Sequence, residues 1–505
     1  MSPADPGPES VDDRPAEYGQ DVHGMGRRAA RGAAITIGGQ ATRIVLQVGG
    51  VVVLARLLSP TDYGLIAMVT AITGIGELFR DFGLSSAAIQ AKTLSVAQRS
   101  NLFWLNSAIG LLLCVLTASL AVPISHLYGQ PDLVPVVHAL ALTFLFNGMA
   151  TQFRADLTRR MAFTRLAVID VASSAVALVA AIAMALAGAG YWALVGQQLT
   201  TALVLLIGVL IVAPWRPGLP RRGVPMRGLL SFGWNLLATQ LVGYASNNVD
   251  SLTIGIRFGA VQLGLYNRAY QLLMSTLSQL RAPTTTVALP ILSRLRDDPV
   301  RFAEFVRRGQ LALAYGLVAG LAFVAAAAEP LTAILLGDQW LSATPLIRLL
   351  AIAGMFQTLA YVGYWVYLAR GLTGVLLRYT IVSAIIKIIC VVGGSHWGTV
   401  GVAAGFALAP ALSWPLSLWW LSRHSPVQLW TLIGGALRTL AAFGISGVAA
   451  YLAADALDPA SSWATLGIEA AVYVLLLGTA CLVIPSLRRD VRDVSFAVKL
   501  AMHRA

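Results

Sequence analysis

The sequence contains little charge. Of its 505 residues, 12% are charged and 57% are hydrophobic, and the mean hydropathy is +0.73. Soluble globular domains carry about 25% charged residues. This shortage of charge excludes an ordinary water-soluble domain and indicates a chain that lies largely within a lipid bilayer.

Residues that form disulfides or bind metals are also scarce. The three cysteines, Cys114, Cys390 and Cys481, each fall within an apolar run, so no disulfide framework is expected. The six histidines are scattered, and no pair has the spacing of metal ligands. The sequence has no G-x-x-x-x-G-K-S/T loop, which disfavours an ATP-driven pump. We therefore expect neither a metal site nor a cofactor.

Long apolar runs, in contrast, are abundant. A membrane-spanning helix needs about 20 mostly apolar residues, and fourteen such runs are separated by charged or turn-forming residues. The sequence therefore predicts an all-α polytopic membrane protein. The predicted spans are 33–55, 64–90, 101–122, 134–153, 166–188, 191–213, 231–256, 262–290, 309–328, 342–369, 374–393, 398–421, 430–452 and 463–484.

The basic residues indicate how the chain is oriented. Arginines and lysines gather at every second connection between the spans, whereas Arg56 and Arg257 lie at the intervening ones. The positive-inside rule then places both termini in the cytoplasm. Residues 1–32 are expected to form a disordered cytoplasmic tail, and 485–505 a basic one. Because topology accounts for the net charge of +13, a nucleic-acid partner is not expected.

An internal repeat predicts the domain organisation. The segments 54–68 and 255–269 each combine a helix end with Arg, a short turn and then Gly, Leu or Tyr opening the next span. Six spans separate them, so both copies enter the membrane in the same direction, which makes the repeat parallel. We predict two six-helix bundles with a pseudo-two-fold relationship and two additional helices. The ranges are 33–213 and 231–421 for the bundles, 214–230 for a cytoplasmic linker, and 430–484 for the additional helices.

Polar residues form stripes on the first two helices of each half. Glu77, Arg80 and Asp81 have the spacing i, i+3 and i+4, so they project from one helical face. An ionised group at the bilayer centre costs about 2.5–3.5 kcal/mol, and such residues usually face the protein interior or a wet cavity. The other stripes contain Thr36, Gln40, Arg43 and Gln47; Asn235, Thr239, Ser246, Asn247 and Asp250; and Arg268, Gln271, Ser275, Ser278 and Arg281.

Two interpretations of these stripes remain open. In the first, the hydrophilic edges of both halves line a shared aqueous cavity. In the second, Arg43, Glu77, Arg80 and Asp81 form a buried, self-neutralising cluster that fixes how the first two helices pack. A paired cluster can also line a cavity, so the two are compatible. Asp250 and Arg268 lie nearer the outer surface, where a long side chain can also reach water.

Three segments resemble a known family of transporters. They are LARLLSPTDYGLIAMVTAITGIGELFRDFGLSSAAIQ (54–90), LLSFGWNLLATQLVGYASNNVDSLTIGIRFGAVQLGLYNRAYQL (229–272) and LARG (368–371). They are similar to the polysaccharide transporters of the multidrug/oligosaccharidyl-lipid/polysaccharide exporter superfamily, in particular to the colanic-acid-exporter branch of the Wzx-type flippases. The resemblance implies a bacterial inner-membrane protein with two lobes. Such a protein moves an undecaprenyl-diphosphate-linked oligosaccharide to the outer leaflet by alternating access.

The resemblance also implies roles for individual residues. In this family, arginines that line the central cavity are thought to hold the anionic headgroup of the substrate. The substrate-binding candidates on this chain are Arg43, Arg80, Arg268, Arg281, Gln40, Gln47, Asn247 and Gln271. The candidates for coupling to H⁺ or Na⁺ are Glu77, Asp81 and Asp250. Polysaccharide polymerases and glycosyltransferases are the expected partner machinery.

Other functions fit the sequence less well. A lipid-II flippase or a multidrug exporter of the same superfamily shares the expected architecture and remains the nearest alternative. A membrane-embedded polymerase, ligase or glycosyltransferase usually carries its reactive groups in a large loop at the membrane surface. The longest outer connection here, 329–341, contains only two acidic residues, Glu329 and Asp338. We therefore expect a transporter without catalytic residues.

Overall fold

The structure is a computed structural model that describes residues 38, 42, 45–81, 95–221 and 227–502. Over these residues the chain is helical and contains no strand. The elements, in chain order, are Val45–Leu57, α2 (Pro60–Asp81), α4 (Val96–Ser119), α5 (Ala121–Tyr128), α6 (Leu133–Arg159), α7 (Phe163–Leu186), α8 (Trp192–Val212), α9 (Arg227–Tyr270), η1 (Gln271–Ser275), α10 (Thr276–Arg294), α11 (Pro299–Leu313), η2 (Ala314–Val318), α12 (Ala319–Ala326), α13 (Ala328–Leu335), η3 (Asp338–Ala343), α14 (Thr344–Ala369), α15 (Thr373–Gly394), η4 (Ser395–Trp397), α16 (Gly398–Ser422), α17 (Leu429–Leu457), α18 (Ser462–Val483) and α19 (Pro485–Met502).

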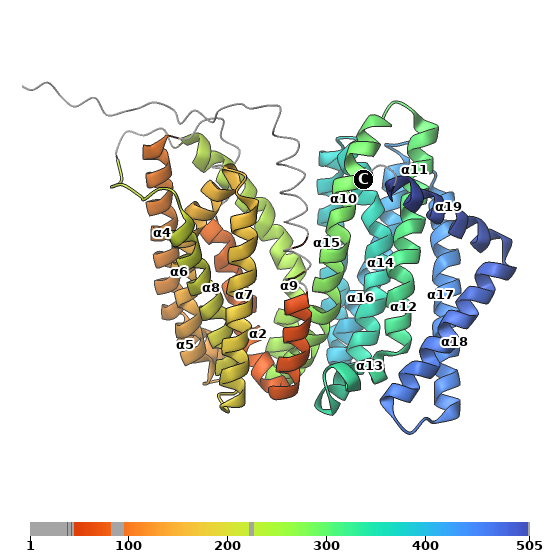
Figure 1. The fold of residues 1–505 in the computed structure, drawn as a ribbon, viewed down its shortest axis with the longest axis horizontal. Helices are drawn as coiled ribbons and strands as arrows, with labels where there is room; N and C mark the ends of the chain where they lie inside the picture. Colours follow the sequence, from red (N-terminus) through yellow and green to blue (C-terminus); the bar gives the residue numbers. More distant parts are fainter. Residues whose placement is uncertain (1–37, 39–41, 43–44, 82–94, 222–226, 503–505) are drawn as a thin grey trace, which may run out of the picture.

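Two groups of helices stand side by side (Figure 1). The first contains α2 and α4 to α8, in which α4 packs on α6 and α7 packs on α8. The second contains α10 to α16, in which α16 packs on both α14 and α15. Helix α9 runs directly into η1 and α10 of the second group and lies where that group meets the first, while α17 and α18 stand at the outer edge of the second group and contact each other closely.

The helices have the length and composition of membrane spans. Ten helical segments of the described residues are long and apolar enough to cross a bilayer, and one of these, Thr373–Ser422, holds both α15 and α16. A shorter apolar helix covers Val45–Leu57. The prediction of an all-α polytopic membrane protein is confirmed. Each of the fourteen predicted ranges overlaps a described helix, but the count of fourteen spans stays a prediction.

Helix α9 consists of two helical segments, the seventh predicted span and the start of the eighth. The sequence predicts a turn at 257–261, and the two segments are joined within that range at Gly259 (φ 78°, ψ −175°), where the backbone is not helical. Glycine tolerates this positive φ because it has no Cβ. A π-helical turn, η1, then leads into α10, which contains Pro283 and Pro290. The chain therefore reverses at Gly259 without an extended loop.

The two groups meet through α2 and α9. A Cβ atom on Gly64 of α2 would lie 1.8 Å from the carbonyl oxygen of Ala260. A Cβ atom on Gly264 of α9 would likewise lie 1.8 Å from the carbonyl oxygen of Pro60. Both distances are far too short for a carbon–oxygen contact, so only glycine fits at either position. The helices therefore touch backbone to backbone.

Further hydrogen bonds join the groups at the same end of the molecule. The indole Nε1 of Trp340 in η3 donates to the carbonyl oxygen of Ala55 at 2.8 Å. The guanidinium of Arg56 donates to the carbonyl oxygen of Ile334. These residues flank connections that the sequence predicts to face outward. The two groups are therefore closed against each other at this end.

The amphipathic helix α19 crosses the opposite end of the second group, at the top of Figure 1. Asp490 faces the bundle, where Arg438 of α17 donates to both of its carboxylate oxygens at 2.6 and 2.8 Å. Arg307 of α11 binds Asp493 at 2.6 Å. Burial raises the pKa of Asp490, and this effect outweighs the lowering by Arg438. Two ion pairs thus hold α19 against the bundle.

Candidate functional site

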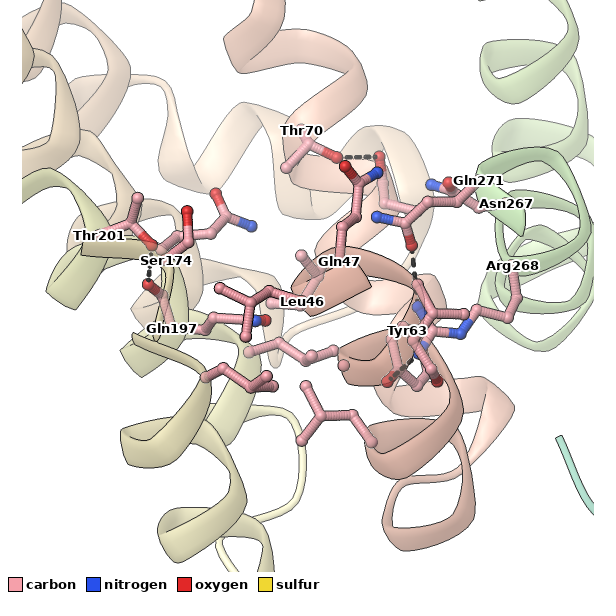
Figure 2. Close-up of a pocket in the computed structure, with 18 residues that line it drawn as sticks. Leu46, Gln47, Tyr63, Thr70, Ser174, Gln197, Thr201, Asn267, Arg268 and Gln271 are labelled. Atoms are coloured by element: carbon pink, nitrogen blue, oxygen red, sulfur yellow. Dashed lines mark hydrogen bonds between the residues drawn. The ribbon is translucent and has the colours of Figure 1, made fainter. Parts of the chain in front are cut away.

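A cavity of about 490 Å³ lies where the two groups of helices meet (Figure 2). The first group contributes the helix Val45–Leu57 together with α2, α7 and α8, and the second contributes the end of α9 and the start of η1. Its lining is therefore shared between elements far apart in the chain. The polar lining residues are Gln47, Tyr63, Thr70, Ser174, Gln197, Gln198, Thr201, Asn267, Arg268 and Gln271.

Arg268 is a charged residue in the wall of this cavity. Its side chain is 3% exposed, and its guanidinium lies 4.0 Å from the ring centre of Tyr63. Its Nη2 donates to the hydroxyl of Tyr63 at 2.7 Å and to the carbonyl oxygen of Val51. Its Nη1 donates to Oε1 of Gln271 at 2.8 Å. Arg268 therefore reaches across from the second group and is held by neutral acceptors of the first.

No carboxylate of the described chain forms an ion pair with Arg268, and its Nε has no hydrogen-bond partner. A buried positive charge with only neutral acceptors is costly unless an anion compensates it. The site is thus electrostatically prepared for an anionic group. Arginine suits phosphate in particular because its planar donors can bind two oxygens at once.

Two of the predicted glutamines also lie in the cavity wall. Gln271 accepts the hydrogen bond from Arg268 described above. Gln47 accepts a hydrogen bond from Nε2 of Gln279 at 3.2 Å, which again joins the first group to the second. Of the predicted substrate-binding residues, the structure therefore brings Gln47, Arg268 and Gln271 together.

The remaining charged candidates of α2 form a separate network within the first group. Nε of Arg80 lies 2.7 Å from Oε2 of Glu77, and Nη1 donates to the hydroxyl of Thr151 at 2.7 Å. The side-chain amide of Asn147 donates to the other oxygen of Glu77 at 3.4 Å. This pairing joins α2 to α6 and lies outside the wall of the cavity. Gln40, Arg43 and the side chain of Asp81 lie outside the described residues.

The other candidates of the second group are dispersed. Arg281 is 8% exposed, and its guanidinium lies 5.2 Å from the ring centre of Tyr361. Asp250 is 1% exposed and accepts a hydrogen bond from the hydroxyl of Tyr266, while its Oδ1 has no partner. Asn247 is exposed. None of these three lines the cavity.

The sequence analysis missed the cavity residues of α7 and α8. Ser174, Gln197, Gln198 and Thr201 face the cavity from helices that were treated as ordinary apolar spans. The signal was present in α8, an otherwise apolar helix of 21 residues. Its four polar residues lie close together, at Gln197, Gln198, Thr200 and Thr201. The predicted polar stripes each contain an ionisable residue, and α8 contains none.

Comparison with known proteins identifies the family. A family model described as polysaccharide biosynthesis protein matches residues 53–345. The chain belongs to this family. The match includes both long segments on which the resemblance was based, and the resemblance is thereby confirmed.

Several characterised members of the polysaccharide biosynthesis family are similar in sequence. The lipopolysaccharide biosynthesis protein WzxC of Escherichia coli is 27% identical over 75% of this chain and 78% of its own length. The teichuronic acid biosynthesis protein TuaB of Bacillus subtilis is 28% identical over 65% of this chain and 68% of its own. The succinoglycan biosynthesis transport protein ExoT of Rhizobium meliloti is 24% identical over 60% and 61%.

Solved structures share the fold of this family member. The lipid II flippase MurJ in an inward closed conformation superposes with a TM-score of 0.67 at 13% identity, over 90% of this chain and 99% of that one. An inward-facing multidrug transporter of the MATE family gives a TM-score of 0.57 at 13% identity, over 80% and 99%. These likenesses show the polytopic helical fold.

Proposed function

We propose that this protein is a secondary transporter that moves a lipid-linked oligosaccharide or polysaccharide precursor, carried on undecaprenyl diphosphate, across the bacterial inner membrane by alternating access. The observation that carries the proposal is the polar cavity shared by both groups of helices, with Arg268 unpaired by any described carboxylate. Its similarity to WzxC, TuaB and ExoT, which are polysaccharide biosynthesis or transport proteins, supports it.

The cavity has the properties that such a substrate requires. A diphosphate with attached sugars is strongly hydrated, so it needs a polar route through the hydrocarbon core. The cavity volume of about 490 Å³ lies within the range of about 300–1,000 Å³ that is usual for ligand pockets. Arg268 supplies a guanidinium for the diphosphate, and the amides of Gln47 and Gln271 supply neutral donors beside it. The lipid tail remains in the bilayer.

Alternating access requires two bodies that move against each other. The proposed bodies are the six-helix bundles 33–213 and 231–421, joined by the linker 214–230. The reciprocal contacts of Gly64 with Ala260 and of Gly264 with Pro60 support a parallel repeat, because each contact maps onto the other by a shift of 200 positions. With both termini in the cytoplasm, the end closed by these contacts faces outward.

Coupling to an ion gradient is part of the proposal. Glu77, Asp81 and Asp250 remain the candidates for H⁺ or Na⁺ coupling. Asp250 is favoured because it is buried and one of its oxygens lacks a partner. A buried carboxylate that changes its protonation or its bound cation can bias a two-state equilibrium when the two states differ in its surroundings.

A lipid II or multidrug exporter is the alternative. The shared fold admits both, but the structures concerned are 13% identical to this chain, whereas polysaccharide relatives are 24–28% identical. The sequence relationship therefore favours polysaccharide precursors.

Reconstitution tests the proposed function. Proteoliposomes containing the full chain and a fluorescent undecaprenyl-diphosphate oligosaccharide are expected to move the probe between leaflets faster than protein-free liposomes. Arg268→Ala should lower the rate at least about tenfold, because a charge-assisted hydrogen bond contributes about 1.5–3 kcal/mol. Arg348→Ala is the matched control, since Arg348 donates to the carbonyl oxygen of Ala325 away from the cavity. A wild-type rate equal to that of empty liposomes would refute the proposal.

A further inference from the structure

The two sides of the cavity differ in their chemistry. The side formed by α9 and η1 carries the charged residue Arg268. The side formed by α7 and α8 carries only uncharged polar residues: Ser174, Gln197, Gln198 and Thr201. Figure 2 shows Ser174, Gln197 and Thr201 opposite Arg268 and Gln271, with Gln47 between them. The cavity is therefore polarised from a neutral to a cationic side.

The glutamine amides of α8 are available to a ligand. The hydroxyl of Thr201 donates to the backbone carbonyl of Gln197 at 2.7 Å, and that of Ser174 donates to the backbone carbonyl of Asp170 at 2.8 Å, so these two protons are used within their own helices. Within the described part of the chain, the side-chain amides of Gln197 and Gln198 have no hydrogen-bond partner. Both residues are half-buried and line the cavity.

Such amides are unusual in a membrane helix. Every other residue of α8 except Thr200 and Thr201 is apolar, and burying an amide without a partner costs about 1–3 kcal/mol. Two adjacent glutamines within an apolar helix are therefore expected only where water or a ligand satisfies them. Each amide offers two donors and an acceptor, which is the pattern that complements neighbouring hydroxyl groups of a sugar.

We infer that the α7–α8 side of the cavity binds the glycan of the substrate. Gln197 and Gln198 recognise the uncharged hydroxyl or acetamido groups of this glycan. Arg268, on the opposite side of the cavity, binds the diphosphate. This inference rests on the proposed function and adds an orientation to it. The headgroup lies across the cavity, with its phosphates against the second bundle and its sugars against the first. The ligand class at α7–α8 is a neutral saccharide, because the lining there provides no charge to pair with an acidic sugar.

Two lipid probes separate the glycan contacts from the phosphate contacts. The full chain in nanodiscs is titrated with undecaprenyl diphosphate, which has no sugar, and with undecaprenyl diphosphate that carries a neutral oligosaccharide. The double substitution Gln197→Leu and Gln198→Leu should weaken binding of the sugar-bearing probe about tenfold, the loss expected for two neutral hydrogen bonds. Binding of the sugar-free probe should stay within about twofold of wild type. Arg268→Gln should weaken both probes by the same factor.

The controls make each result decisive. Thr200→Val changes a polar residue of α8 that does not line the cavity, and it should leave both affinities unchanged. Unchanged binding of the sugar-free probe shows that the double variant is folded. If the double variant does not fold, the single variant Gln198→Asn is tested instead. It should bind the sugar-bearing probe more weakly than wild type, by less than tenfold, and the sugar-free probe as wild type does. Equal losses for both probes, or no loss for either, would overturn the inference. Failure of wild type to bind either probe would instead contradict the proposed function.

Discussion

Gly64 of α2 and Gly264 of α9 lie against each other where the two halves meet, and each leaves room for a backbone carbonyl of the opposite helix. The Cβ position of Gly264 is also only 3.0 Å from the backbone nitrogen of Gly64. Contact this close depends on the absence of side chains at both positions. A substitution at either position therefore tests whether the halves separate at this end during the transport cycle.

We predict that Gly64→Ala opens the contact between α2 and α9. A methyl group at 1.8 Å from the carbonyl oxygen of Ala260 cannot be accommodated, and overpacking of this kind costs about 1–3 kcal/mol. Spin labels on the two helices should show a longer distance in the variant. Gly49→Ala, in the neighbouring helix with open space around its Cβ position, should leave the distance unchanged. Equal distances in wild type and Gly64→Ala would contradict the packing described.

The network around Arg80 predicts a structural effect. Arg80→Ala removes the ion pair with Glu77 within α2 and the hydrogen bond to Thr151 that joins α2 to α6. We expect the free energy of unfolding to fall by about 1–3 kcal/mol, while the affinity for undecaprenyl diphosphate stays at the wild-type value. Thermal unfolding in detergent and the nanodisc titration measure the two quantities. Lost affinity with unchanged stability would place Arg80 in the binding site instead.

The shape of the Arg268 side chain should matter as well as its charge. The guanidinium donates at once to the carbonyl oxygen of Val51, to Tyr63 and to Gln271, which fixes its orientation. Lysine keeps the charge but cannot reproduce this planar set of donors. We therefore expect Arg268→Lys to move the lipid-linked probe at about one tenth of the wild-type rate or less. Full activity of Arg268→Lys would show that charge alone is sufficient.

The docking of α19 should depend on pH. Burial raises the pKa of Asp490 in the folded state above its unfolded value of about 3.9. The folded state therefore holds the proton of Asp490 to a higher pH than the unfolded state does. Asp490 contributes to stability at pH values below its pKa in the unfolded state. This contribution is lost as the pH rises through the pKa of Asp490 in the folded state. The thermal midpoint of wild type should thus fall with rising pH in this window, relative to Asp490→Asn.

Asp493→Asn provides the control for this prediction. It removes a different ion pair on the same helix, with Arg307, and leaves Asp490 and Arg438 in place. The variant should retain a pH dependence of the same sign, because burial of Asp490 is the largest cause of its raised pKa, but a smaller one, because the charge of Asp493 also raises that pKa. A pH dependence that persists unchanged in Asp490→Asn would show that another group is responsible.

Hydropathy predicted the spanning helices closely where lipid alone decides the pattern. The predicted ranges 430–452 and 463–484 correspond to Leu429–Leu457 and Ser462–Val483. The turn predicted at 257–261 contains the reversal at Gly259, but a single glycine with positive φ makes it in place of a loop. Hydrophobicity does not report on this backbone conformation.

The site was predictable only in part. Arg268 was found because a charge in an apolar run is conspicuous, but its location in the cavity wall depends on Val51 and Tyr63 of the other half. Arg281 has a similar sequence context yet lies against Tyr361. Gln197 and Gln198 were overlooked because each predicted polar stripe contains an ionisable residue, and α8 contains none. Which polar residues share a cavity is decided by tertiary contacts between helices.

The central claim is that the saccharide headgroup of the substrate enters the cavity. Site-specific photocrosslinking in membranes tests it most directly, with a photoreactive residue in place of Gln198, which lines the cavity, or of Leu210, an exposed residue further along α8. We predict a covalent adduct containing the sugar at position 198 and none at position 210. Sugar-containing adducts at position 210 and not at 198 would contradict the account.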